Sequence, residues 1–139
     1  MKASIALLAS ILISICSNCQ ANGALTVVAN IDKELINLSR HEVRNLFMGI
    51  ATRYKLSAIS LPPKNHTRII FNTRILGLTE SRIQSYWAQM RFTGRKEAPK
   101  EIASEELMLE YLRNNKGAVG YLPAGVSLPD ELTVIYKIF

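Results

Sequence analysis

The chain alternates between two kinds of segment after residue 23, and this alternation is what most restricts its fold. Residues 24–30 (ALTVVAN), 58–63 (AISLPP), 118–124 (AVGYLPA) and 132–139 (LTVIYKIF) are apolar and rich in β-branched side chains, as buried strands are. Four stretches with apolar residues at helical spacing are interleaved with these strands. Because strands and helices alternate over a length typical of one domain, the sequence predicts a single α/β domain.

The predicted helices are marked by their ends. They cover residues 38–49, 67–77, 81–92 and 104–117. Ser39 and Glu42 form a capping-box pattern, and Ser104 stands where a cap would open the fourth helix. Residues 93–103 are predicted to be a loop. The apolar faces of the first and third helices are predicted to comprise Val43, Leu46, Phe47 and Ile50, and Ile83, Tyr86, Trp87 and Met90.

Residues 1–21 have the three-part pattern of a secretory signal peptide. Lys2 supplies the positive charge, residues 5–16 are apolar or small, and a short polar stretch follows. This apolar run is too short to span a bilayer comfortably. We expect cleavage after Ala21, with Gly23 as the second choice, and an uncleaved anchor as the less favoured alternative. The mature domain, 22–139, would then be periplasmic, without a transmembrane span and without Cys16 and Cys19.

The charge balance favours an anionic partner. The chain has 17 basic and 11 acidic residues, a formal charge of +6, and its 48% hydrophobic content excludes a disordered chain. Oxyanions, phospholipid head groups and cell-wall polymers fit this charge. Because export separates the protein from DNA and RNA, we expect no nucleic-acid partner.

Residue types for catalysis or metal binding are scarce. His41 and His66 are the only histidines, and they are neither paired nor at metal-ligand spacing. The sequence contains no nucleophile elbow and no GxxxxGKS phosphate loop. We therefore expect no enzymatic activity, no metal and no cofactor.

The turn before the second predicted helix is the candidate binding site. Pro62 and Pro63 end a strand, and the helix start that follows presents free N–H groups, which attract anions. Cations flank this turn, and either an asparagine or a threonine can cap it. On spacing alone, an ordinary cap with hydrated cations is the more frequent outcome, and an oxyanion cradle is the functional alternative. The candidate ligand-binding residues are Lys64, Asn65, His66, Thr67, Arg68 and, from a second basic cluster, Arg95.

Several segments together resemble the periplasmic phosphate-binding proteins of ABC transporters. These segments are LSRHEVRNLFMG at 38–49, TRIIF at 67–71 and residues 86–123, in which NKGAVGYLP is the most specific part. The resemblance covers nearly the whole mature chain. It implies a single lobe of a periplasmic-binding-protein type II fold, with a small mixed sheet flanked by about four helices.

The resemblance also implies where a ligand would bind. The family's Ser-Gly-Thr turn at a helix start, which binds phosphate, falls on Asn65-His66-Thr67. Two of these three residues differ in type, Leu61 stands near the position of a family arginine, and the anion loop expected after the first strand is absent. One lobe with this altered turn predicts weak binding, unless a homodimer rebuilds a cleft.

Two functions follow as hypotheses from different classes. The first is an exported, non-enzymatic protein that binds inorganic phosphate or a similar oxyanion in phosphate uptake or sensing. The alternative is a scaffold that docks on an envelope protein and retains a vestigial anion site. A hydrolase is a distant third, since no nucleophile–base pair is present.

Overall fold

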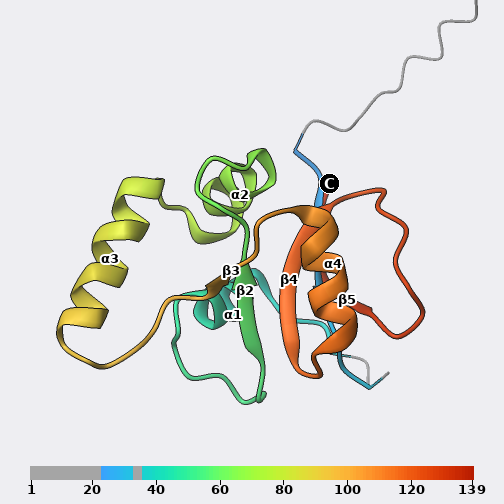
Figure 1. The fold of residues 1–139 in the computed structure, drawn as a ribbon, viewed down its shortest axis with the longest axis horizontal. Helices are drawn as coiled ribbons and strands as arrows, with labels where there is room; N and C mark the ends of the chain where they lie inside the picture. Colours follow the sequence, from blue (N-terminus) through green and yellow to red (C-terminus); the bar gives the residue numbers. More distant parts are fainter. Residues whose placement is uncertain (1–22, 33–35) are drawn as a thin grey trace, which may run out of the picture.

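The structure is a computed structural model that describes residues 23–32 and 36–139. The predicted signal peptide, residues 1–21, therefore lies outside the described residues. Within the described part, no helix combines the length and the apolar character needed to cross a bilayer. Figure 1 shows the arrangement of the helices and strands.

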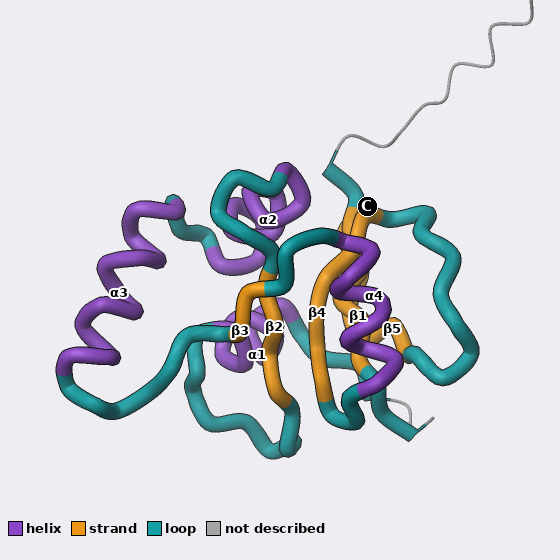
Figure 2. The backbone as a smooth tube through the Cα atoms, viewed as in Figure 1, coloured by secondary structure: helices purple, strands orange, loops and turns teal. Residues whose placement is uncertain are grey.

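A mixed five-stranded sheet forms the centre of the domain, in the order β3-β2-β4-β1-β5 (Figures 1 and 2). β1 pairs antiparallel with both β4 and β5, whereas β2 pairs parallel with β3 and β4. The predicted α/β class and mixed sheet are confirmed. The strands are β1 (Leu25–Ala29), β2 (Ser57–Ser60), β3 (Lys100–Glu101), β4 (Ala118–Pro123) and β5 (Thr133–Ile138).

Four α-helices accompany the sheet in the described residues, in agreement with the prediction. α4 packs against β4, and α1 packs against β2. In contrast, α3 projects away from the sheet in Figure 1. The helices are α1 (Arg40–Phe47), α2 (His66–Phe71), α3 (Glu80–Phe92) and α4 (Glu105–Asn114), and a π-helical turn, η1 (Asn72–Leu76), continues α2.

An aromatic group joins the helices to the sheet. The rings of Phe71 and Tyr121 stack with their centroids 4.0 Å apart, and Phe47 lies 4.5 Å from Phe71. The Tyr121 hydroxyl accepts a hydrogen bond from the Leu61 N–H at 3.1 Å and lies 2.8 Å from Ser60 Oγ. Because these contacts hold the end of β2, they also fix where the chain enters α2.

The helix caps predicted from local patterns are present. Ser39 and Glu42 form both halves of the capping box. The Ser104 hydroxyl accepts a hydrogen bond from the backbone N–H of Leu107 at the start of α4. Gly77 has φ +65° and closes η1, a left-handed conformation that glycine adopts without a Cβ clash.

Three predictions about secondary structure were wrong. The helix predicted over 67–77 changes to π geometry at Asn72, and this wider turn buries both Ile75 and Leu76. Ile50 lies outside α1 and is 40% exposed, because Gly49, at φ +68°, turns the chain away after the helix. The loop predicted over 93–103 contains β3, which exists through its pairing with β2.

Candidate anion-binding site

The candidate turn is built as a capped helix start. After β2, the Asn65 N–H donates to the carbonyl of Pro62 at 3.0 Å and closes the turn. The Asn65 side chain then accepts a hydrogen bond from the Arg68 N–H at 3.1 Å. Of the two residues predicted to cap this helix, Asn65 is therefore the one that does so.

The Thr67 hydroxyl already has an anionic partner within the chain. Thr67 is 5% exposed, and its Oγ1 donates to Glu105 Oε1 at 2.6 Å. Glu105 opens α4 and is partly buried. The hydroxyl that was predicted to bind an oxyanion thus donates its hydrogen bond to a carboxylate of another helix.

Arg68 points into the protein and away from the turn. Its Nε and Nη2 form a two-pronged pair with the Glu80 carboxylate, at 3.0 and 2.6 Å. Its Nη1 donates to the Leu61 carbonyl at 2.6 Å and also lies within hydrogen-bond distance of Ser60 and Glu101. Because these bonds hold a guanidinium that is 5% exposed, Arg68 connects β2, α2 and α3.

Glu80, whose side chain is 29% exposed, is the centre of this partly buried network. Besides Arg68, the side-chain amides of Asn72 and Gln84 donate to its carboxylate at 2.8 and 2.7 Å. Burial opposes ionisation of Glu80, but the hydrogen bonds from Arg68, Gln84 and Asn72 and the attraction to Arg68 outweigh it. The pKa of Glu80 consequently lies below its ordinary value.

The remaining candidate residues lie in two places. Lys64 and His66 are exposed on the turn itself. Arg95 follows the C-terminal end of α3, which Figure 1 shows well away from α2. The fold therefore brings Lys64, Asn65, His66 and Thr67 together at one surface, and Arg95 belongs to a different one.

The acidic partners of this region, Glu105 and Glu80, are not among the residues predicted for the site. Their partners lie 38 and 12 residues away along the chain, beyond the reach of any helical spacing rule.

A cavity of about 90 Å³ also borders Arg68 and Asn72, between the sheet and Trp87 of α3. In the described ranges, no three His, Cys, Asp or Glu side chains are grouped to hold a metal.

The described residues form one mixed α/β fold, and comparisons with known proteins show where this fold occurs. No family model and no curated protein sequence matches the chain. Two solved structures share its fold: an ABC-type phosphate transport receptor from Vibrio cholerae and a putative phosphate ABC transporter substrate-binding protein with bound phosphate from Clostridium perfringens. Their TM-scores are 0.59 and 0.60, and their sequence identities are 21% and 12%. Each alignment covers 81% of this chain and a little under half of the other, 45% and 44% respectively.

Proposed function

We propose that the protein binds inorganic phosphate or a closely related oxyanion at the start of α2, as a non-enzymatic component of phosphate uptake or sensing in the periplasm. The fold shared with two proteins named for phosphate transport supports this ligand class. The contacts of the described residues give no support to an envelope scaffold or a homodimer, so we do not adopt either as a second function.

The observation that carries the proposal is the composition of the α2 start. Lys64 and His66 are exposed there, beside a buried Thr67 hydroxyl. Asn65 already binds the Arg68 N–H, so the N–H groups of His66 and Thr67 are the ones that this helix start offers to an anion. Lys64 adds a positive charge to this surface. The ligand keeps part of its hydration because these donors approach it from one side.

Glu105 determines which oxyanion this arrangement favours. A carboxylate beside Thr67 repels a fully ionised anion such as sulfate. The same carboxylate can accept a hydrogen bond from an anion that still carries a proton, as phosphate does near neutral pH. We therefore expect phosphate to bind more tightly than sulfate, with a dissociation constant of about 1 mM, which corresponds to about −4 kcal/mol.

Calorimetric titration of the exported protein with phosphate tests the proposal. Thr67→Val removes the hydroxyl, and Lys64→Ala removes the exposed charge. We expect each to weaken phosphate binding by about three- to tenfold, since the net contribution of one hydrogen bond is about 0.5–1.5 kcal/mol. Lys55→Ala is the matched control, because Lys55 is an equally exposed lysine outside the turn. Absence of heat at millimolar phosphate, or an equal loss in Lys55→Ala, would contradict the proposed site.

A further inference from the structure

The free end of α3 presents an unusually exposed aromatic ring. Phe92, in the last turn of this helix, is 94% exposed, more than any other large hydrophobic residue described. α3 itself projects from the sheet (Figure 1). Single exposed apolar residues are common on protein surfaces, so the surroundings of this ring decide whether it has a role.

The end of α3 is closed by a defined hydrogen-bonded turn. The Gly94 N–H donates to the Arg91 carbonyl at 3.0 Å, and the Arg95 N–H donates to the Met90 carbonyl at 3.2 Å. With Gly94 at φ +65°, these two bonds form a Schellman motif. The apolar contact that usually accompanies this motif would involve the residue at Arg95. Here that residue is a cation, so the motif ends the helix with a charge in place of an apolar contact.

Three cations lie within four residues of Phe92 in the sequence. Arg91, Arg95 and Lys96 form no ion pair within the described part of the chain. The aliphatic stem of Lys96 passes close to Gly49, where an added Cβ would lie 3.2 Å from Lys96 Cδ. This contact holds the stem on the protein and leaves the ammonium group at its end for solvent. We call Arg91, Phe92, Arg95 and Lys96 the α3 tip.

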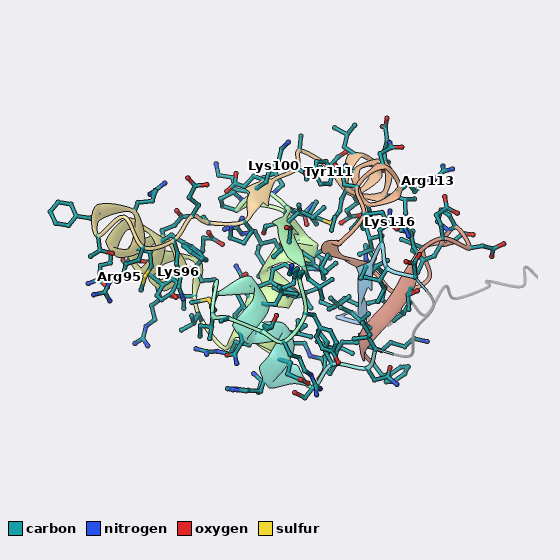
Figure 3. All side chains as sticks on the ribbon, turned by 90° about the horizontal axis from the view of Figure 1, so that it is seen from below. Arg95, Lys96, Lys100, Tyr111, Arg113 and Lys116 are labelled. Carbon is teal, nitrogen blue, oxygen red and sulfur yellow. The ribbon has the colours of Figure 1, made fainter. Side chains whose placement is uncertain are left out.

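Two other basic residues labelled in the same view are paired with carboxylates. Figure 3 labels Arg95 and Lys96 at one side of the molecule and Arg113 and Lys116 at the other. Arg113 pairs with Glu131 at 3.0 Å, and Lys116 pairs with Asp32. Arg91, Arg95 and Lys96 differ from these two in having no carboxylate partner among the described residues.

We propose that the α3 tip docks on an anionic phospholipid surface. An aromatic ring enters the interface between head groups and acyl chains, while flanking lysine and arginine residues stay at the level of the phosphates. The negative potential of such a surface attracts each of these cations. A protein partner fits the tip less well, because a stable protein interface needs about 800 Å² from each side and a projecting helix end offers little contiguous area.

Co-sedimentation with vesicles tests the proposal. The exported protein, with its N-terminus verified by mass, is mixed with vesicles of phosphatidylcholine containing phosphatidylglycerol, or of phosphatidylcholine alone. We expect binding to the anionic vesicles that weakens as salt is added. Phe92→Ala should weaken it about tenfold, and Arg95→Glu should weaken it by about fivefold or more. Phe139→Ala should have no effect, because Phe139 is similarly exposed, at 91%, but lies at the other end of the sheet.

A spectroscopic variant separates insertion from simple adhesion. Phe92→Trp keeps an aromatic ring at the tip, so it should retain binding, and its emission should shift to shorter wavelength when anionic vesicles are added. No binding, equal binding to neutral vesicles, or an equal loss in Phe139→Ala would overturn the proposal. Self-association of the protein in light scattering that Phe92→Ala abolishes would also overturn it, in favour of a second copy as the partner.

Discussion

Thr67 and Arg68 are neighbours in α2, and each is bound to a carboxylate from another helix, yet the two contacts differ in kind. Both residues are 5% exposed. Thr67 gives one hydrogen bond, to the partly buried Glu105. Arg68 gives Glu80 two, and Glu80 receives two more from Asn72 and Gln84.

This difference separates a structural contact from an exchangeable one. To release Arg68, a ligand would have to replace several hydrogen bonds and leave a buried charge without its partner, which is costly. To release Thr67, it would have to replace one hydrogen bond whose acceptor can turn to solvent. A ligand at the proposed site would therefore compete for Thr67, whereas Arg68, although predicted to bind the ligand, holds β2, α2 and α3 together.

The largest expected effect is the loss of stability on replacement of Arg68. Arg68→Ala leaves Glu80 without its charge partner and should lower the free energy of unfolding by about 3–5 kcal/mol. Arg53→Ala is the matched control, since Arg53 pairs with Glu42 at 3.0 Å but its side chain is 69% exposed. Such a surface pair contributes about 0–1 kcal/mol. Urea denaturation measures both, and similar losses for the two variants would remove the distinction between buried and exposed pairs.

The Glu80 carboxylate makes a smaller, pH-dependent contribution. Glu80→Gln should lower stability at neutral pH by about 1.5–3 kcal/mol, because it weakens hydrogen bonds to a charged group. The pKa of Glu80 in the folded protein is lowered, so its contribution is present above the ordinary value of 4.5 and is lost as the pH falls through the folded-state pKa. The difference between the wild type and Glu80→Gln should therefore shrink below about pH 4.5. Denaturation at pH 7 and pH 3 measures it, and a difference that stays constant or grows at pH 3 would assign the stabilisation to other groups.

Contacts between residues close together in the sequence were predicted correctly, whereas contacts between separate elements were not. The caps at Ser39 and Ser104 follow from spacing of three residues, and the strand at 118–124 follows from its own composition. The two-residue strand β3 carries no such pattern, because it is defined by its parallel pairing with β2. Arg68 looked like a ligand residue for the same reason: the carboxylate that it binds lies in α3, a separate helix.

The position of the candidate turn could be predicted from the sequence, but the hydrogen bonds of its side chains could not. A strand ended by prolines and followed by a helix start locates the turn, and the structure has this turn where it was expected. The packing of α2 against α4 decides which residue caps the helix and brings a carboxylate to Thr67. A single sequence holds no information on that packing beyond its apolar pattern.

The smallest expected effect on stability, and the most informative for the site, comes from Glu105. Glu105→Gln preserves an oxygen acceptor for Thr67, so the free energy of unfolding should change by less than about 1 kcal/mol. Removing its charge should raise the affinity for sulfate by about five- to tenfold, because a like charge a few ångströms away costs about 1 kcal/mol or more near a protein surface. The gain for phosphate should be smaller, since the carboxylate that repels this anion also accepts a hydrogen bond from it.

Paired calorimetric titrations of wild type and Glu105→Gln measure the change in affinity for each anion. Glu106→Gln is the control, because Glu106 is the exposed neighbour in the same helical turn. Equal gains for the two anions would mean that Glu105 acts by charge alone, and gains of the same size in Glu106→Gln would mean that the ligand does not bind beside Thr67.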